Sequence, residues 1–264
     1  MDEDKVDGKT LFEQLGKGVI RSGGFYLNGM WSPWCVQHKI YAGLRDAYRY
    51  TGTREALDVE IKFAAWAKRI LAPLSDDQIQ RMLVTEFSAM NEVFADLYAD
   101  TGDRRWLALA GTFHHKAIVD RLAENKDILP GIHGSTQIRK LYGSLKLYLY
   151  TGGKVEGAAA KYFWNEVTEH RTLTTGGNTR NEYFRQPDQL SEMVDGRTAE
   201  ACNVYNLIKM ARLLFSIQTD IRNADYHERA LFIHILASQD PDDKRVCYMV
   251  PVGRSVLHQY NGKL

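Results

Sequence analysis

Apolar residues recur every three or four positions along most of the chain. In residues 54–71 this spacing joins Leu57, Ile61 and Ala64, which is the pattern of an amphipathic helix with one buried face. The same pattern returns, more weakly in the last case, at residues 103–122, 154–171 and 221–236. Each of these four stretches follows another apolar stretch. The pattern therefore predicts four pairs of helices in tandem and an all-α chain.

A Thr-Gly pair separates the two helical stretches in the first three pairs. These dipeptides are spaced by 50 residues, at Thr51-Gly52, Thr101-Gly102 and Thr151-Gly152. A glycine directly after a helix suits a left-handed C-cap. The repeat therefore predicts that each Thr-Gly lies at the tip of an αα-hairpin, and only the fourth pair lacks the glycine.

The rest of the chain predicts long loops and little strand. Short strands are expected only at residues 172–175 and 246–252. The loops are expected at residues 22–34, 125–135, 172–198 and 239–264. Tandem hairpins could form an open superhelix or a closed ring. Long irregular loops in a compact domain are usually functional, so we favour a ring with a site on one rim, although αα-toroids close with six hairpins.

Composition excludes several classes of protein. The 264 residues carry 34 Lys and Arg against 33 Asp and Glu, without the basic excess of a nucleic-acid-binding protein. No apolar run approaches the ~20 residues that span a bilayer. The acidic start, MDEDKV, is unlike a signal peptide, and the three cysteines, far apart in the sequence, do not form an even disulfide framework. We expect no nucleic-acid or membrane partner, and the compartment stays open.

The loop at residues 172–198 contains the first candidate site. Gly176 and Gly177 allow close approach of a ligand, and Glu182 stands beside Tyr183 and Phe184. A carboxyl group against aromatic walls has a raised pKa, which would make Glu182 a general acid near neutral pH. The alternative is a surface loop with a solvated glutamate.

A second candidate follows at the start of the next helix. Thr198 is expected as its N-cap, with Glu200 in the first turn and Cys202 close behind. A helix N-terminus lowers the pKa of a thiol, and Glu-x-Cys could supply two zinc ligands. Zinc sites need three or four protein ligands. The alternative is a small buried cysteine.

Two further clusters suit sugar binding. Trp31 precedes a helix and could stack on a sugar face, while His38 could bond to hydroxyl groups. Gln137 lies one helical turn after His133 and forms a similar polar cluster. Packing of these side chains against the domain is the alternative. The chain has no Gly-x-Ser-x-Gly elbow and no phosphate-binding loop.

Together these motifs resemble the β-L-arabinofuranosidase-type glycoside hydrolases of families 127 and 146. The matching stretches are GGFYLNGMWSPWCVQHKIYAGLRDAY, MNEVFADLYADTGD, LPGIHGSTQIRK, TTGGN, NEYF, TAEACNVYN and YHERALFIHILASQDP. They cover nearly the whole chain in the family's order. The most specific is Glu-x-Cys-Asn with the upstream Gly-Gly-Asn and Glu-aromatic-Phe.

The resemblance implies an (α/α)6 barrel and retaining cleavage of terminal β-L-arabinofuranosyl or related units of plant glycans. Glu182 matches the general acid/base, and Glu200 and Cys202 match two zinc ligands. In the family the other two ligands, one of them the nucleophile, come from a Cys-Cys pair that would lie after Leu264. His38, Trp31 and Gln137 are the candidates for sugar contacts.

The chain also departs from the family pattern. Phe87 stands where a histidine is common, and Ser88-Ala89 replace glycines. The resemblance therefore implies that residues 1–264 are a partial barrel domain, without the N-terminal helices, the Cys-Cys segment and the C-terminal β-sandwich. We expect such a chain to hydrolyse no glycosides, to bind zinc poorly and to associate through exposed barrel flanks. The alternatives are a non-catalytic carbohydrate-binding αα-repeat protein and another αα-toroid enzyme, such as a sugar epimerase.

Overall fold

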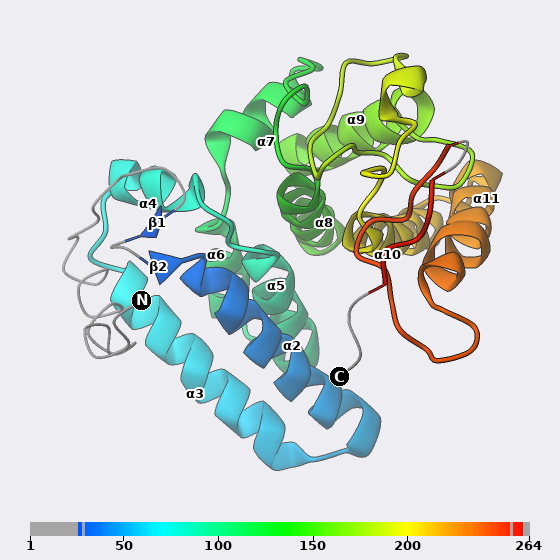
Figure 1. The fold of residues 1–264 in the computed structure, drawn as a ribbon. Helices are drawn as coiled ribbons and strands as arrows, with labels where there is room; N and C mark the ends of the chain where they lie inside the picture. The colour runs from blue at the N-terminus through cyan, green and yellow to red at the C-terminus, as the bar shows by residue number, and fades with distance from the viewer. Residues whose placement is uncertain (1–25, 28–29, 254–255, 261–264) are drawn as a thin grey trace. The chain divides into compact units, whose positions relative to one another are not determined.

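A computed structural model describes residues 26–27, 30–253 and 256–260, and these residues are mainly helical (Figure 1). The α-helices are α2 (Pro33–Thr51), α3 (Arg54–Leu71), α4 (Asp76–Leu83), α5 (Met90–Thr101), α6 (Arg105–Gly111), α7 (Lys116–Ala123), α8 (Gly134–Thr151), α9 (Lys154–His170), α10 (Ala201–Ile217) and α11 (Ile221–Arg229). The shorter elements are the strands β1 (Tyr26–Leu27) and β2 (Met30–Trp31), the 3-10 helices η2 (Leu190–Met193) and η4 (Leu236–Ser238), and the π-helix η3 (Ala230–Ile235). The all-α prediction is confirmed.

The Thr-Gly dipeptides lie at the tips of helix hairpins, as predicted. Gly52, Gly102 and Gly152 adopt φ values of 75°, 74° and 69°. Each glycine N–H donates to the carbonyl four residues earlier, and each threonine hydroxyl bonds to a carbonyl of the preceding helical turn. The glycine contact uses one of the last four carbonyl groups of the helix, which have no partner within it. The repeated dipeptide therefore ends α2, α5 and α8 in the same way.

Other predicted elements differ from the structure. The stretch at 103–122 is broken into α6 and α7, and α11 continues as η3 and η4. The strand expected at 172–175 is wrong, because these residues form a turn. Residues 246–252 form only isolated bridges, to three different segments of the chain. Pairing with a new partner at each bridge prevents a continuous strand.

The chain forms two compact units, Met1–Lys116 and Ala117–Leu264. In the first unit, aromatic rings fill the space among α2, α3 and α5. Tyr41 stacks on Phe63 with ring centroids 4.5 Å apart, and Trp34 meets Phe113 edge-on at 5.3 Å. Phe87 is fully buried in the same cluster, 5.6 Å from Phe113. Ring packing of this kind stabilises a core beyond the area that it buries.

The first unit also buries charged groups. Arg45 of α2 bonds to Asp96 at 2.8 Å and to Asp100 at 2.7 Å on α5. Glu60 of α3 is fully buried, and neither of its carboxyl oxygens has a hydrogen-bond partner among the described residues. Burial, followed by the charge of Asp100, raises the pKa of Glu60 to about 8. A neutral Glu60 is therefore the stable form below that pH.

In the second unit, α8, α9, α10 and α11 surround a separate apolar core. Buried residues of that core include Leu141, Phe163, Val204 and Met210. Trp164 of α9 meets Tyr226 of α11 edge-on, with ring centroids 5.2 Å apart. This core packs α8 and α10 together, and the candidate site lies at the N-terminal ends of these two helices.

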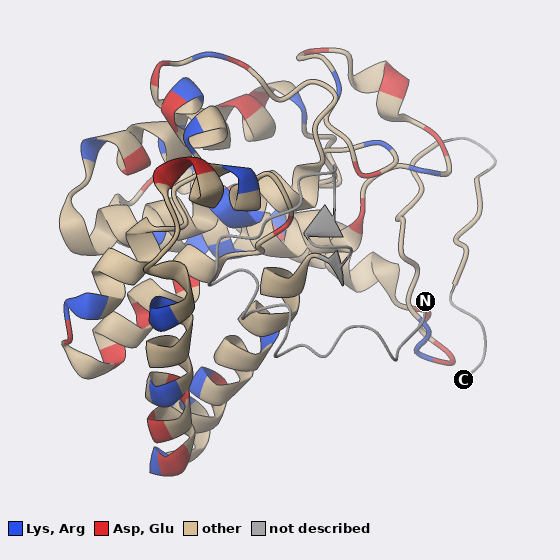
Figure 2. Ribbon diagram, turned by 90° about the vertical axis from the view of Figure 1, so that its left-hand side faces the viewer, with Lys and Arg blue, Asp and Glu red and all other residues tan. Residues whose placement is uncertain are grey.

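Charges of both signs are interspersed along the helices (Figure 2). Among the described residues, no helix combines the length and the apolar character needed to cross a membrane.

Glycine substitutions test the hairpin tips. Gly102→Ala should lower the free energy of unfolding by about 1 kcal/mol, because a side chain disfavours the left-handed region. Gly43→Ala is the control, since Gly43 lies within α2 with no atom within 4 Å of an added Cβ. That change should stabilise by about 0.5–1 kcal/mol. Urea denaturation measures both, and equal effects of the two changes would contradict the assignment.

Glu60→Gln tests the buried carboxyl group. Between the ordinary glutamate pKa of 4.5 and the folded pKa of about 8, the native state holds a proton that the unfolded state has released. Stability should therefore fall as pH rises through this range, by up to about 1.4 kcal/mol per pH unit. The variant, which has no proton to lose, should exceed the wild type in stability by more at pH 8 than at pH 5. Urea denaturation followed by tryptophan fluorescence measures this, and a pH-independent difference would contradict it.

Candidate functional site

Glu182 lies at the tip of a tight turn in the second unit. Arg180 and Tyr183 exchange backbone hydrogen bonds of 3.2 Å in both directions. Between them Asn181 and Glu182 adopt φ values of 52° and 71°. Two consecutive positive φ values are those of a type I′ hairpin turn, in which glycine is preferred. The backbone therefore holds Glu182 in a conformation that a residue with a side chain disfavours.

A short antiparallel pairing places this turn at the start of α8. The N–H of Phe184 donates to the carbonyl of Ile132 at 3.0 Å, and the N–H of Gly134 donates to the carbonyl of Glu182 at 2.8 Å. His133 and Tyr183 form a bridge between these two bonds. His133 and Glu182 therefore become neighbours although they are 49 residues apart.

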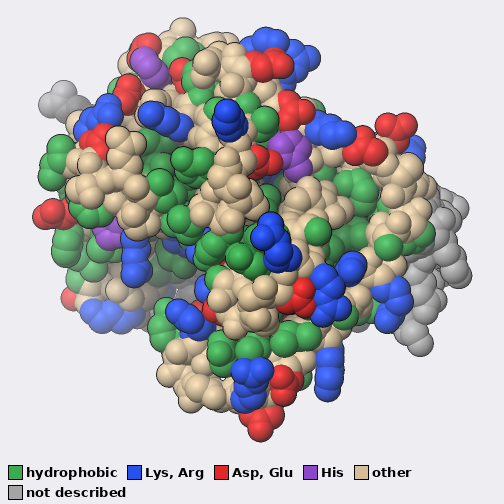
Figure 3. All heavy atoms as spheres, turned by 180° about the vertical axis from the view of Figure 1, so that it is seen from behind, with side chains coloured by type: hydrophobic (Ala, Val, Ile, Leu, Met, Phe, Trp, Pro, Cys, Tyr) green, Lys and Arg blue, Asp and Glu red, His purple; other side chains and the backbone are tan. Residues whose placement is uncertain are grey.

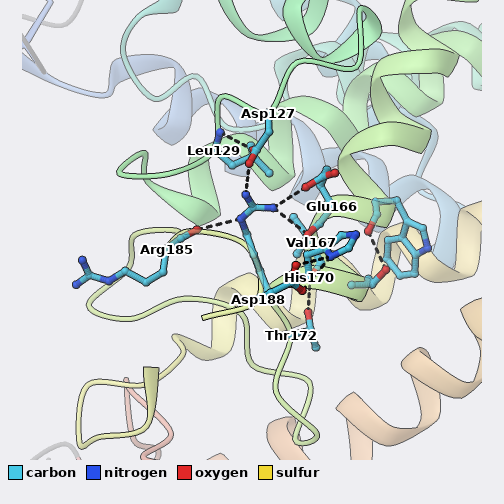
Figure 4. Close-up of polar contacts among 11 residues, drawn as sticks. Asp127, Leu129, Glu166, Val167, His170, Thr172, Arg185 and Asp188 are labelled. Atoms are coloured by element: carbon cyan, nitrogen blue, oxygen red, sulfur yellow. Dashed lines mark hydrogen bonds and ion pairs between the residues drawn. The ribbon is translucent and has the colours of Figure 1, made fainter. Parts of the chain in front are cut away.

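The side chain of Arg171, just after α9, is buried and supports both paired segments. Figure 4 labels the partners of this side chain, Asp127, Glu166 and Arg185. Its guanidinium donates to the Arg185 carbonyl at 3.0 Å and to Glu166 at 2.9 Å, and it also pairs with Asp127. Asp127 in turn accepts a bond from the N–H of Leu129. Asp127 and Arg185 lie on the two segments that pair beside Glu182. One side chain thus fixes both to the end of α9.

Two side chains reach the Glu182 carboxylate. The hydroxyl of Tyr248 donates to Oε1, and Nε2 of His133 lies 3.4 Å from Oε2. Nδ1 of His133 accepts a bond from the N–H of Thr136, as the N-cap of α8. A neutral imidazole that accepts at Nδ1 carries its proton at Nε2, so it presents a donor to Glu182.

The aromatic neighbours of Glu182 in sequence lie elsewhere. Phe184 is fully buried and packs against Phe163 of α9. The ring of Tyr183 meets the ring of His133 edge-on at 5.5 Å. The side chains in contact with the Glu182 carboxylate are therefore the polar groups of His133 and Tyr248.

The start of α10 differs from the sequence prediction in two ways. Thr198 is not the N-cap, because its hydroxyl bonds to the backbone of Met193 and Asp195 in the loop. Glu200 itself takes the N-cap position, without a capping hydrogen bond from its side chain. Cys202 is the second residue of the helix and contacts Glu200 Oε1 through its sulfur.

The prediction of a lowered thiol pKa at Cys202 is wrong. Burial, and then the negative charge of Glu200, raise the pKa of this thiol to about 12. The hydroxyl of Ser135 donates to the sulfur at 3.7 Å and offsets only part of this effect. Here desolvation and a neighbouring carboxylate outweigh the helix terminus. Without a metal ion, Cys202 is therefore a thiol and not a thiolate.

Glu200 and Cys202 have the chemistry of two zinc ligands. Their donor atoms are in contact, and Oε2 of Glu200 is buried without a hydrogen-bond partner among the described residues. The described residues contain no group of three or more His, Cys, Asp or Glu that could hold a metal ion. Because tetrahedral zinc needs at least three protein ligands, these residues do not fit a complete zinc site.

Tyr248 connects the two candidate clusters. Its hydroxyl reaches Glu182, while its carbonyl accepts a bond of 3.4 Å from the N–H of Ala201. Burial, the bond to Glu182 and the charge of Glu200 all raise the pKa of Tyr248, so its hydroxyl stays a donor. Sequence analysis missed Tyr248, because a lone tyrosine 66 residues beyond Glu182 gives no local signal.

A close approach at Gly134 completes the arrangement. An added Cβ at Gly134 would lie 2.6 Å from the Thr179 side chain and 2.8 Å from Asn203 Nδ2. Asn203 of α10 donates to the hydroxyl of Thr179 at 2.9 Å. Because Gly134 has no side chain, the start of α8 can contact Asn203 of α10 and Thr179 of the loop. The structure brings Glu182, Glu200 and Cys202 to the same end of these helices.

The proposed sugar-contact residues lie in both units. Gln137, in the second unit, is 7% exposed on α8, one turn after His133, and its buried Oε1 has no hydrogen-bond partner among the described residues. His38, in the first unit, is buried with Nδ1 3.2 Å from Ser88 Oγ and Nε2 3.4 Å from Glu92. Trp31 forms part of β2, and its side chain lies outside the described residues.

Comparison with known proteins identifies the family. The chain matches the catalytic domain of the GH127 β-L-arabinofuranosidases over residues 10–263. No curated protein matches the chain.

Solved structures support the fold. A structure described as a GH127 β-arabinofuranosidase is 19% identical with a TM-score of 0.63, over 83% of this chain and 36% of its own. A GH127 β-L-arabinofuranosidase from Geobacillus stearothermophilus T6 is 21% identical with a TM-score of 0.58, over 92% and 44%. An inactive variant of an α-1,6-mannanase of Salegentibacter sp. HEL1_6 is 13% identical with a TM-score of 0.55, over 92% and 74%.

These likenesses assign the helices to the α/α-barrel type of fold. The chain spans less than half the length of the two GH127 structures. Because the family match extends over almost every residue of the chain, this protein belongs to the GH127 glycoside hydrolases, within the catalytic domain of that family.

Proposed function

We propose that this chain contributes the acid/base Glu182 to a glycoside hydrolase that removes terminal β-L-arabinofuranosyl or related units from plant glycans with retention of configuration, and that residues 1–264 alone do not catalyse the reaction. Family membership supports the hydrolase class, and two structural relatives are described as arabinofuranosidases. The observation that carries the proposal is the Glu182 carboxylate with donors from Tyr248 and His133 at its two oxygens.

Glu182 is the proton donor and acceptor in this proposal. Its side chain is partly exposed, so a substrate oxygen can reach it. As an acid it protonates the leaving oxygen of the glycosidic bond while a nucleophile other than the described residues bonds to the sugar, and as a base it then takes a proton from the water that displaces this nucleophile. The contacts of Tyr248 and His133 hold the carboxylate in place. They disfavour rotamers of the Glu182 side chain that would point it away from the substrate.

Glu200 and Cys202 are proposed as zinc ligands, together with donors other than the described residues. When bound, zinc would hold the Cys202 sulfur as a thiolate. The reaction steps assigned to Glu182 do not depend on it. The family resemblance assigns the attack on the sugar to a different cysteine, so we propose Cys202 for metal binding only.

Sugar contacts are proposed for Gln137, His38 and Trp31. Gln137 is the best supported, because its buried carbonyl oxygen lacks a protein partner among the described residues and lies one turn from His133. A sugar hydroxyl could donate to that oxygen and satisfy it. Association of copies through exposed barrel flanks also remains a proposal.

Glu182→Gln tests the assignment of the acid/base. Turnover of an aryl β-L-arabinofuranoside is measured for the 264-residue chain beside a version extended at both ends. In whichever form is active, Glu182→Gln should lower kcat/KM by about 10²–10⁴-fold. The loss should be smallest for a substrate with an activated leaving group, because that group needs no protonation. Glu192→Gln, at an exposed position of the same loop, is the matched control and should leave turnover unchanged. Equal activity of Glu182→Gln and wild type would refute the role.

Backbone strain at Glu182 gives a second test. Glu182→Gly should be more stable than Glu182→Ala by about 1 kcal/mol, because glycine accepts a φ of 71° without a steric cost. At Glu192, whose φ is not positive, alanine should instead be the more stable of the two substitutions. Thermal denaturation measures the four variants. The same order at both positions would show that residue 182 is not strained.

A further inference from the structure

A cavity of about 400 Å³ lies at the end of the second unit opposite to Glu182. Its walls come from the last turns of α8 and α10, from α9 between Lys154 and Asn165, and from the start of α11. Tyr148, on its wall, lies 15 residues beyond His133 along α8, or about 22 Å at 1.5 Å per residue. The cavity is therefore separate from the candidate catalytic site.

Polar side chains without partners line this cavity. The amide of Asn223 is only 8% exposed, and it makes no hydrogen bond to any described residue. The side-chain amides of Asn165 and Gln218 also line the cavity without such bonds. Asn165 is half-buried and Gln218 is exposed, so the polar atoms of these amides are open to solvent or to a ligand in the cavity. These groups can therefore donate to and accept from a hydroxylated ligand.

The charge of the lining is positive. Lys154 and Lys161 of α9 have no ion-pair or hydrogen-bond partner among the described residues. Arg222 is already held by Asp220 at 2.8 Å and by Glu169 at 3.1 Å. Two ammonium groups thus remain for a ligand, and the N-terminus of α9 at Lys154 adds to the positive potential.

Aromatic and small residues shape the apolar wall. Trp164 and Tyr148 line the cavity, and Ala158 leaves its space open. An added Cβ at Gly157 would lie 2.7 Å from the Tyr148 ring, so glycine lets that ring rest against α9. Hydrophobic and basic side chains also adjoin one another on the surface seen in Figure 3. The apolar wall formed by Trp164 and Tyr148 suits the C–H face of a sugar ring.

We propose that this cavity binds a monosaccharide-sized sugar acid, a uronate. Its carboxylate would pair with Lys161 and Lys154, its hydroxyls would bond to the amides of Asn165 and Asn223, and its ring would pack against Trp164. A bare anion such as phosphate satisfies only the lysines, and a neutral sugar satisfies only the amides and the rings. The proposal does not depend on the glycosidase activity.

The chain offers a local probe for the test. Trp164 is the only tryptophan of residues 117–264, so a 5-fluorotryptophan label gives one ¹⁹F signal from this unit, assigned with Trp164→Phe. Galacturonate at up to about 10 mM should shift that signal with a saturable dependence on concentration, because the bound sugar ring lies against Trp164. Galactose and inorganic phosphate, titrated alone, should bind at least tenfold more weakly.

Three variants locate the site. Ala158→Leu fills the cavity and should abolish the shift caused by galacturonate. Lys161→Met removes one charge and should weaken binding about tenfold. Lys126→Met, at an exposed lysine paired with Glu124 outside the cavity, should change nothing. Circular dichroism and the thermal midpoint confirm that each variant is folded.

Several results would overturn the proposal. An unmoved Trp164 signal at the highest galacturonate concentration would exclude binding. If galactose bound as tightly as galacturonate, the lysines would have no role in recognition. If phosphate bound as tightly as galacturonate, the site would be an anion site without sugar recognition. Galacturonate binding that is unchanged in Ala158→Leu would show that the binding site lies outside this cavity.

Discussion

The buried guanidinium of Arg171 holds together the segments that carry the candidate site. Removing a guanidinium from water is costly unless its donors are satisfied. Here they bond to a carboxylate on α9, to Asp127 and to the carbonyl of Arg185. Because those last two residues flank the pairing of residues 131–134 with 182–184, the geometry of His133 and Glu182 follows from satisfying one buried cation.

The same region stores backbone strain. Asn181 and Glu182 adopt positive φ values; asparagine tolerates this conformation, whereas for Glu182 it costs about 1–2 kcal/mol. The pairing with the start of α8 and the close contact at Gly134 hold the turn in place. Strained residues of this kind gather at functional sites, where a fixed side chain matters more than local stability. The carboxylate of Glu182 is accordingly aimed by the backbone as well as by Tyr248 and His133.

The helices of the second unit have two chemically different ends. The N-terminal ends of α8 and α10 carry acidic and thiol groups, from Glu182 on the paired loop to Glu200 and Cys202. The opposite end carries lysines and amides, unpaired among the described residues, around a cavity. The apolar core between them separates the ends, so a change at one end can be made without touching the other. This separation is what allows the proposed uronate site to be tested independently of catalysis.

Local patterns in the sequence determined the helices, their hairpin tips and the family. The three- and four-residue apolar period and the Thr-Gly repeat depend on interactions within a few residues, so α3 and the caps at Gly52, Gly102 and Gly152 follow the prediction. The candidate acid Glu182 was also found from sequence, through its loop and the resemblance. These features need no knowledge of distant contacts.

Tertiary structure alone decided the surroundings of each site residue. Tyr248 reaches Glu182 from 66 residues away, and Phe184 turns into the core instead of lining the carboxylate. The Cys202 thiol has a raised pKa because burial and Glu200 outweigh the helix N-terminus that the sequence suggested. Hydrogen-bond partners and desolvation depend on which distant segments pack together, and a local pattern does not encode that packing.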